Sequence, residues 1–300
     1  MSDDADARVV VAVLADDTPY CATGTELLAD RLFSLGASAV SEMPGDDGGR
    51  VRLVADLPVE SLDRLDVPFE LLEHDPTWED SWQDHAAAVP VGERLLLRPE
   101  WVDADVRGAA ADSPDPADSL DSAPPIEVVL DAAHAFGSGS HPTTRLCLEA
   151  IERLGADLVG ARVLDVGAGT GVLGVAALVL GAGSLVAVDI DPAAIATTRR
   201  TAELNGVTDR VIEVSSRGVA EVTAEHGPFD LVLANLLIPI IETLGPELAA
   251  AVAPGGRMIL SGLLADPSTR QVQRAIDVTG LRPADAGVAE LDGWAVLVDR

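Results

Sequence analysis

A buried strand, a glycine-rich turn and a helix follow one another without interruption in the middle of the chain. The segment Ala161–Gly174 reads ARVLDVGAGTGVLG, and the apolar pattern of a helix continues to Leu180. The first N–H groups of a helix have no partner within it, so this turn presents donors to a ligand. A second apolar strand ends at Asp189, 22 residues after Gly167. This is close to the spacing of about 20 residues at which a carboxylate holds a ribose, so the sequence predicts a βαβ unit that binds a nucleoside.

The residues of the turn favour S-adenosylmethionine (AdoMet) over a dinucleotide. Gly169, Gly171 and Gly174 satisfy G-x-G-x-x-G, which alone is a weak signal. Asp165 stands just before the glycines, where a carboxylate would repel a pyrophosphate but suits a ligand that carries a cation or an amino acid. Together with Gly167 the glycines follow the pattern D-x-G-x-G-x-G, which is typical of AdoMet-dependent methyltransferases. A turn that only closes the strand–helix junction is the alternative without a ligand.

Several tracts around this unit are shared with one known family. They read DAAHAFGSGSHPTTRLCLEAIE, VLDVGAGTGVLGVAA, VAVDIDPAAI, LVLANLL and APGGRMILSGLL. From about Asp75 to the C-terminus the chain resembles the PrmA family, whose members methylate ribosomal protein eleven of the large subunit. The tract AFGSGSHPTT is the most specific, because other methyltransferases lack it. The chain departs from the family at Ala132 and Ala133, where the family carries Pro-Gly, and at Ser138 and Ser140, where it carries threonines.

The resemblance implies an AdoMet-binding site and no metal. Asp165 would fix the glycine turn or meet the amino group of AdoMet, and Asp189 would hold the ribose hydroxyls. The stretch 136–139 would form a lid loop over the cofactor. The expected cofactor-binding residues are Phe136, Gly137, Ser138, Thr143, Thr144, Asp165, Gly167, Gly169, Gly171, Asp189, Ile190 and Asn235.

Methyl transfer to an amine calls for a site without a strong acid–base pair. A lysine amine has a reference pKa of about 10.4 and must lose its proton before attack, which an apolar pocket favours and a nearby carboxylate opposes. Asn235, followed by the apolar Leu236 and Leu237, offers such surroundings at the end of a predicted strand. It aligns with the asparagine of the family's Asn-Ile-Leu pattern, so the resemblance implies that Asn235 is the catalytic residue and orients the amine or the methionine end of AdoMet. The alternative is that Asn235 caps the next helix.

Three further positions carry expectations of their own. His141 is a candidate base, with a structural hydrogen bond within its loop as the alternative. Asp191 is expected to cap the helix that follows it. Ser215 and Ser216 follow the third strand, where methyltransferases often place an aspartate toward the adenine amine, so the chain departs from that pattern.

The composition narrows the classes of function. The net charge is −30 and all 20 basic residues are arginines, so the chain should repel nucleic-acid phosphates and attract a basic partner. Salt adaptation or a GC-biased genome explains the acidity as well. The two cysteines and five histidines show no metal-ligand spacing. No signal core or apolar stretch of ~20 residues is present, so we expect a cytoplasmic protein without a membrane span. We also expect its cysteines to be reduced and the protein to be a monomer.

The alternation of strands and helices predicts an α/β fold. Residues 126–300 should form a seven-stranded, doubly wound (Rossmann-like) methyltransferase sheet. Residues 1–74 should form a smaller N-terminal α+β domain, which the resemblance implies is ferredoxin-like and recognises the substrate, and its short second half predicts a truncated form. The connector, residues 75–125, contains an acidic insertion at 103–125 that is predicted to be disordered. We place the insertion in a hairpin between Leu95–Leu97 and Ile126–Leu130.

The elements of the sheet domain follow from apolar periodicity and capping residues. Strands are expected at Val163–Val166, Leu185–Asp189, Val211–Val214, Leu231–Ala234, Met258–Ser261, Ala286–Leu291 and Trp294–Val298. The last strand is expected to run antiparallel. Helices are expected at Val172–Leu180, Ala193–Asn205, Ile238–Val252 and Thr269–Thr279, and from a cap at Thr143 or Thr144 to Leu154.

The sequence leaves three hypotheses about function. The first is an AdoMet-dependent protein methyltransferase that modifies lysine side chains, and in a wider form also the N-terminal amine, of ribosomal protein eleven. The second is an enzyme on the same scaffold that acts on another protein or a small amine, because the N-terminal domain is short and the tract at residues 131–140 is altered. The third is an AdoMet-binding module without turnover, which the intact Asp165, Asp189 and Asn235 argue against.

Overall fold

The chain divides into two compact units, residues 1–86 and 87–300. The computed structural model describes residues 8–14, 28, 31–32, 35, 37, 40–44, 51–72, 88–102, 124–131 and 141–299. The predicted domain boundary after residue 74 and most of the predicted insertion lie outside these residues. Within them, no helix is long and apolar enough to cross a membrane.

The first unit carries a four-stranded antiparallel sheet in the order β2-β3-β1-β4. Its strands are β1 (Arg8–Leu14), β2 (Val40–Pro44), β3 (Val51–Pro58) and β4 (Glu70–Leu72). β1 lies between β3 and β4, as in a ferredoxin-like β-α-β-β-α-β chain. A 3-10 helix, η3 (Val59–Arg64), stands where the second helix of that pattern would be, which accounts for the short second half in the sequence.

One face of this sheet forms the core of the first unit. Val11, Val13 and Leu53 pack there with the helical residues Leu28 and Leu32, all of them without exposed surface. The alternate residues of β1 point to the opposite face, as the two-residue period of a strand requires.

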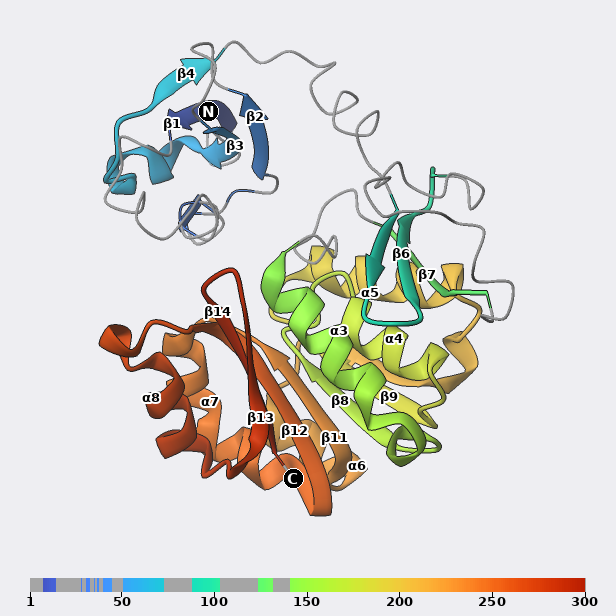
Figure 1. Cartoon of the computed structure of the whole chain (residues 1–300). Coiled ribbons are helices and arrows are strands. Elements are labelled where there is room, and N and C mark those ends of the chain that lie inside the picture. Colours follow the sequence, from blue (N-terminus) through green and yellow to red (C-terminus); the bar gives the residue numbers. More distant parts are fainter. Residues whose placement is uncertain are drawn as a thin grey trace, which may run out of the picture. The chain divides into compact units, whose positions relative to one another are not determined.

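The second unit is built on a seven-stranded sheet in the order β10-β9-β8-β11-β12-β14-β13 (Figure 1). The strands are β8 (Arg162–Val166), β9 (Ser184–Val188), β10 (Val211–Ser215), β11 (Phe229–Asn235), β12 (Val252–Leu264), β13 (Pro283–Leu291) and β14 (Trp294–Asp299). The strands from β10 to β12 are parallel, and β14 runs antiparallel to both of its neighbours. The predicted doubly wound sheet with an antiparallel last strand is confirmed.

Helices cover both faces of this sheet. They are α3 (Pro142–Leu154), α4 (Val172–Val179), α5 (Pro192–Leu204), α6 (Val219–His226), α7 (Ile238–Ala251) and α8 (Gln271–Thr279). Figure 1 shows α7 and α8 on one side and α3 and α4 on the other. Helix α6 is not predicted from the sequence, because it has only eight residues, buries only Val219 and Val222, and its apolar period is too short to recognise.

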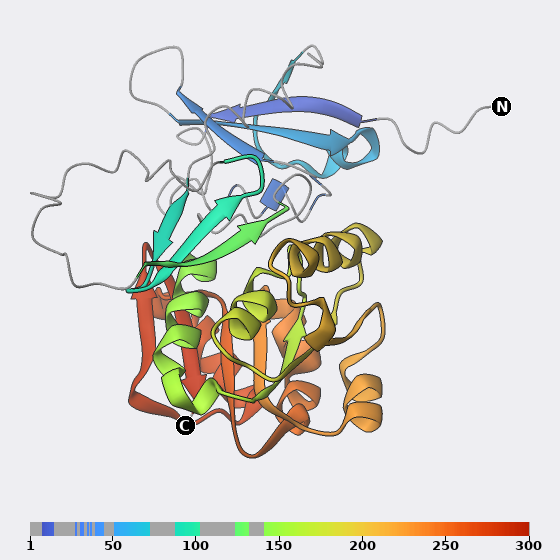
Figure 2. The same cartoon turned by 90° about the vertical axis from the view of Figure 1, so that its right-hand side faces the viewer.

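A three-stranded sheet also belongs to the second unit. β5 (Val89–Val91) and β6 (Leu95–Pro99) form an antiparallel hairpin, and β7 (Ile126–Leu130) lies beside β6 (Figure 2). β6 and β7 are parallel, so the predicted hairpin between these two segments is wrong, although the segments do pair. The connection between them, residues 100–125, is long enough to return the chain to the start of β6, as a parallel pair requires.

The start of α3 also corrects a prediction. Its N-cap is His141, whose Nδ1 accepts the backbone N–H of Thr143 at 3.3 Å, and Pro142 occupies the first turn. Proline suits the first helical position, because its φ is preset and it has no N–H group to satisfy. The helix therefore begins before Thr143 and Thr144 and carries both of them in its first turn.

Candidate functional site

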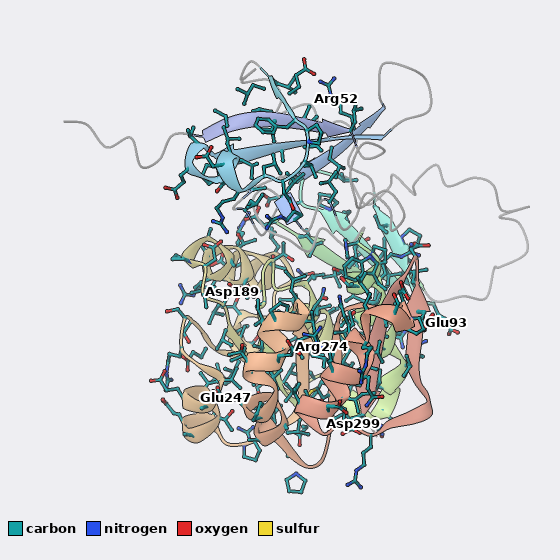
Figure 3. The ribbon with its side chains drawn as sticks, turned by 90° about the vertical axis from the view of Figure 1, so that its left-hand side faces the viewer. Arg52, Glu93, Asp189, Glu247, Arg274 and Asp299 are labelled. Carbon is teal, nitrogen blue, oxygen red and sulfur yellow. The ribbon has the colours of Figure 1, made fainter. Side chains whose placement is uncertain are left out.

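Those predicted site residues that the structure describes lie at the carboxyl edge of the parallel strands. β8 and β11 are neighbours at the centre of the sheet, and the strand order reverses between them; ligands of open α/β sheets bind at such a switch point. Gly167 follows β8, Asp189 follows β9 and Asn235 ends β11. In Figure 3 Asp189 lies toward one end of the unit, and Asp299, the last residue of the antiparallel β14, lies toward the other.

The glycine turn, residues Gly167–Gly171, is held by β9 and α5. The N–H groups of Gly167 and Ala168 donate to the carbonyl of Val188 at 2.9 and 3.2 Å. The Thr198 hydroxyl donates to the carbonyl of Gly169 at 3.0 Å. Gly167, Gly169 and Gly171 have φ of +70°, +55° and +76°, a region that favours glycine. At Gly171 a Cβ would also lie 3.0 Å from the Cα of Thr198, so the turn tolerates no side chain there.

The side chain of Asp165 stabilises the junction between this turn and α4. Its side chain is 1% exposed, and Oδ2 accepts the N–H of Gly174, in the first turn of α4, at 2.9 Å. Burial raises the pKa of Asp165 to about 7; the hydrogen bond from Gly174 opposes this rise and the charge of Asp189 adds to it. The geometry fits the first of the two expected roles, which is to fix the turn.

Asp189 presents its carboxylate at the rim of the turn. Oδ2 accepts the N–H of Gly169 at 2.9 Å and Oδ1 accepts the N–H of Asp191 at 3.0 Å. A carboxylate has about four lone-pair sites, so capacity for further donors such as ribose hydroxyls is left. Ile190 beside it is 92% exposed. Asp191 caps α5 through the N–H of Ala193 at 2.8 Å, and that prediction is confirmed.

Asn235 is connected to α3 by a chain of side-chain hydrogen bonds, which we call the Asn235 relay (His141, Thr143 and Asn235). The Nδ2 of Asn235 donates to Thr143 Oγ1 at 3.1 Å, and Thr143 Oγ1 lies 2.7 Å from His141 Nδ1. Burial lowers the pKa of His141 to about 4, so its imidazole is neutral at pH 7. Asn235 therefore does not cap α7, whose N-cap is Leu237, and the Thr143 hydroxyl is directed to the relay.

Thr144 offers a test of whether a ligand fits. Its side chain is 1% exposed, and within the described part of the chain its buried Oγ1 has no hydrogen-bond partner. Buried polar atoms of this kind are rarely left unpaired. A ligand with a polar group could supply the missing hydrogen bond to Thr144 Oγ1. The amino-acid end of AdoMet has such groups, just as its ribose has hydroxyls for Asp189.

The expected lid residues Phe136, Gly137 and Ser138 lie outside the described residues. The strand that leads to them is fixed by a residue that sequence reasoning missed. The side chain of Asn205, at the end of α5, accepts the N–H of Val129 at 2.9 Å and donates to its carbonyl at 2.6 Å. This two-way hydrogen bond anchors β7 just before the lid tract begins.

Two other contributors were missed. Thr198, which holds Gly169, lies in a helix whose sequence gives no sign of the contact. Gly262 in β12 has φ +87°, and a Cβ there would meet the backbone of Leu236, directly after Asn235. The only available signal for Gly262 was its place in the tract APGGRMILSGLL.

β10 does not end in an acidic residue that faces the site, unlike β9, which is followed by Asp189. The Ser215 hydroxyl donates to Glu213 Oε1 at 2.5 Å and accepts the N–H of Arg217 at 3.4 Å. Ser216 is exposed. The hydroxyl of Ser215 is thus directed back to its own strand.

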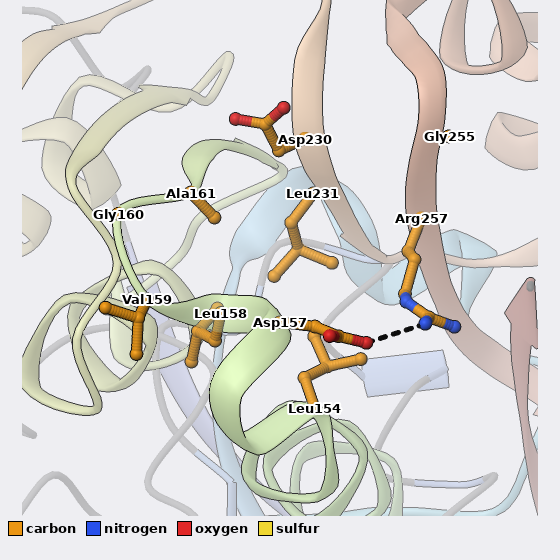
Figure 4. Close-up of a pocket in the computed structure, with 10 residues that line it drawn as sticks. All are labelled: Leu154, Asp157, Leu158, Val159, Gly160, Ala161, Asp230, Leu231, Gly255 and Arg257. Carbon is orange, nitrogen blue, oxygen red and sulfur yellow. Dashed lines mark hydrogen bonds and ion pairs between the residues drawn. The ribbon is translucent and has the colours of Figure 1, made fainter.

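A hollow of about 420 Å³ lies at the opposite edge of the sheet (Figure 4). It is lined by residues at the amino ends of β8 and β11, including Ala161 and Leu231, and by the ion pair of Arg257 and Asp157, 2.8 Å apart. None of the predicted site residues lines it, so it is separate from the candidate site. Among the described residues, no group of three His, Cys, Asp or Glu side chains could hold a metal ion.

Comparison with known proteins connects this geometry to one family. A family model described as "Ribosomal protein L11 methyltransferase (PrmA)" matches residues 50–300. A protein named Ribosomal protein L11 methyltransferase from Parasynechococcus marenigrum (strain WH8102) is 42% identical over 223 residues, which are 71% of this chain and 72% of that relative. A protein of the same name from Azotobacter vinelandii is 34% identical over 295 residues, 89% of this chain and 91% of that relative.

A solved structure agrees with these relatives. The crystal structure of ribosomal protein L11 methylase from Lactobacillus delbrueckii subsp. bulgaricus is 28% identical to this chain, with a TM-score of 0.56. The match covers 70% of this chain and 96% of that one.

Proposed function

The chain belongs to the ribosomal protein L11 methyltransferase (PrmA) family, and on this basis we propose that it transfers methyl groups from AdoMet to amines of ribosomal protein L11. The targets in this proposal are lysine side chains and, in its wider form, the N-terminal amine. The proposal also includes a cytoplasmic location and a monomeric state. It further includes that the protein does not bind nucleic acid, which the net charge of −30 supports.

The residues of the switch point suit each part of AdoMet. The cofactor supplies a methyl group on a sulfonium, and the nitrogen–carbon bond forms as the carbon–sulfur bond breaks. The glycine turn would let the backbone come close to the cofactor, and Asp189 would hold the ribose hydroxyls through its remaining lone pairs. The buried, unpaired hydroxyl of Thr144, in the first turn of α3, would be a partner for the amino-acid end.

The observation that carries the proposal is the neutral character of the surroundings of Asn235. Its side chain contacts Thr143, and behind Thr143 lies the neutral imidazole of His141. Leu236 and Leu237 follow it in the chain. A neutral, partly apolar site lowers the pKa of a lysine amine, so the attacking lone pair becomes available. The barrier then falls mainly through positioning of the amine by the Asn235 amide.

The test is intact-mass spectrometry of purified ribosomal protein L11 incubated with this protein and AdoMet. Because this chain contains no lysine, lysine methylation found in the mixture belongs to the substrate. We expect L11 to gain whole methyl groups, and Asn235→Ala to slow the gain about 100-fold. Gln273→Ala, which removes an exposed side-chain amide from α8, is the matched control and should act as wild type.

An unchanged mass of L11, with AdoMet binding confirmed by calorimetry, would overturn the substrate assignment. Methylation of other proteins or small amines under the same conditions would then identify an enzyme of different specificity on the same scaffold. AdoMet binding without transfer to any acceptor would identify a binding module.

A further inference from the structure

The hydrogen bonds of the Asn235 relay have only one consistent set of proton positions. The backbone N–H of Thr143 points at His141 Nδ1, so this nitrogen is an acceptor and the imidazole proton is on Nε2. The Thr143 hydroxyl, 2.7 Å from the same nitrogen, must therefore donate its proton to it. Oγ1 of Thr143 is then an acceptor for Asn235.

This chain fixes which way the Asn235 amide faces. The amide NH₂ group donates to Thr143 Oγ1 at 3.1 Å. A flipped amide would place its carbonyl oxygen against a hydroxyl oxygen whose proton is already committed, and two acceptors repel each other. The amide carbonyl of Asn235 is thereby turned away from α3.

The relay is also held by packing. The His141 ring meets the Trp294 ring edge to face, with centroids 5.2 Å apart at 64°. Thr143 is 1% and Trp294 2% exposed. Gly262 allows β12 to approach the backbone directly after Asn235. Packing against Trp294 of β14 thus fixes the position of His141, and the close approach of β12 fixes the backbone next to Asn235.

We propose that His141 and Thr143 are positioning residues, which orient the Asn235 amide so that its carbonyl oxygen accepts an N–H of the incoming amine. The inference rests on the proposed function and deepens it, since it assigns a task to two residues that do not themselves touch the substrate. It also removes His141 from the role of a base, because its Nδ1 is committed to the relay. The proton that the amine loses before attack goes to solvent.

Two pairs of variants test the relay. Thr143→Val removes the hydroxyl but keeps the shape of the side chain and the backbone N–H, whereas Thr143→Ser keeps the hydroxyl. His141→Ala removes the acceptor, whereas His141→Asn places Oδ1 where Nδ1 stood and restores both the cap and the relay. Thr243→Val, on the exposed face of α7, is the control for loss of a threonine hydroxyl.

We expect Thr143→Val and His141→Ala to lower kcat on L11 about 10- to 100-fold, with Kd for AdoMet by calorimetry within about threefold of wild type. The conservative partners should recover most of the rate. In an Asn235→Ala background the same substitutions should change kcat less than about twofold, because residues that act as one unit are not additive. The inference would be overturned if the reductions in kcat multiplied with the reduction caused by Asn235→Ala. It would also be overturned if His141→Asn were as slow as His141→Ala.

A measurement without substrate separates failure of the relay from failure of the proposed function. NMR of the side-chain amide of Asn235 should show contacts from its NH₂ protons to the methyl group of Thr143 in the wild-type protein. These contacts should disappear in His141→Ala. If L11 is not methylated but the contacts are present, only the proposed function fails. If the contacts are absent from the wild type, the relay fails.

Discussion

The glycine turn and the Asn235 relay lie at the same edge of one sheet, yet they are built in different ways. The turn is fixed through hydrogen bonds of its own backbone and of the first turn of α4, whose partners are Val188, the carboxyl groups of Asp165 and Asp189, and the Thr198 hydroxyl of α5. The relay consists of hydrogen bonds between side chains, and it joins Asn235, at the end of β11, to Thr143 in the first turn of α3, 92 positions earlier in the sequence. The first suits a cofactor that is the same in every turnover, and the second suits the reacting amine.

The difference predicts different responses to substitution. Changes in the turn should alter folding and AdoMet affinity, because its backbone has no room to adjust. Changes in the relay should mainly alter the rate of transfer. Loss of the Thr143 hydroxyl leaves the N–H partners of α3 in place, and loss of the His141 cap should cost only about 1 kcal/mol of stability. The following predictions test that division, beginning with the largest effect.

Gly171→Ala should destabilise the protein by about 3 kcal/mol or more. The residue has φ +76°, and the new Cβ would lie 3.0 Å from the Cα of Thr198. Gly206→Ala is the matched control, since Gly206 has φ +64° with open space around it, and should cost only about 1–2 kcal/mol. Urea unfolding compares the two. Equal losses would show that the turn is not tightly packed.

The wild-type protein should lose stability as the pH rises, and Asp165→Asn should abolish that loss. The folded protein raises the pKa of Asp165 from 3.8 to about 7, so its contribution is complete below about pH 4 and is lost as the pH rises through 7. The loss corresponds to at most about 4 kcal/mol. Asparagine keeps an acceptor for Gly174 without a charge. Urea unfolding at pH 5 and pH 8 should show that the free energy of unfolding of the variant, relative to wild type, is higher at pH 8 than at pH 5. An equal difference at both pH values would contradict the burial argument.

Asp189→Ala should weaken AdoMet binding about 10- to 100-fold, because hydrogen bonds to a charged group contribute about 1.5–3 kcal/mol. Asp191→Ala, two residues along, is the control: it loses the cap of α5 and about 1 kcal/mol of stability, with AdoMet affinity within about threefold. Calorimetry and thermal melting together separate the two carboxylates. The assignment of the ribose contact to Asp189 does not survive if both variants bind AdoMet alike.

Thr144→Val should give the smallest change, a gain of stability up to about 1 kcal/mol with a loss of AdoMet affinity of about 3- to 10-fold. The reason is the buried Oγ1, which has no hydrogen-bond partner in the described part of the chain and which, in our proposal, pairs with the bound ligand. Thr201→Val is the control, because its Oγ1 is also buried and unpaired but lies in α5. Both variants should melt higher, and only Thr144→Val should bind AdoMet less well. Unchanged affinity would remove Thr144 from the cofactor site.

Much of the fold and the cofactor side of the site could be predicted from the sequence because their determinants are local. The apolar runs of β8 and β9, the alternate glycines and the 22-residue interval to Asp189 all lie within one βαβ unit. Backbone conformations with positive φ favour glycine, and parallel strands joined by a helix have one preferred arrangement. Asp191 could be recognised as a cap for the same reason, since a cap and its helix are adjacent.

The tertiary structure decided what depends on distant packing. The parallel direction of β6 and β7 and the anchoring of β7 by Asn205 involve partners that local periodicity does not specify. The sequence by itself could name Asn235 but not its orientation, because that is set by Thr143 and His141 on another element. Nor could it give the raised pKa of Asp165 or the lowered pKa of His141, since both follow from burial. Sequence spacing determines what lies within one supersecondary unit, whereas side-chain hydrogen bonds and desolvation are determined by which units pack together.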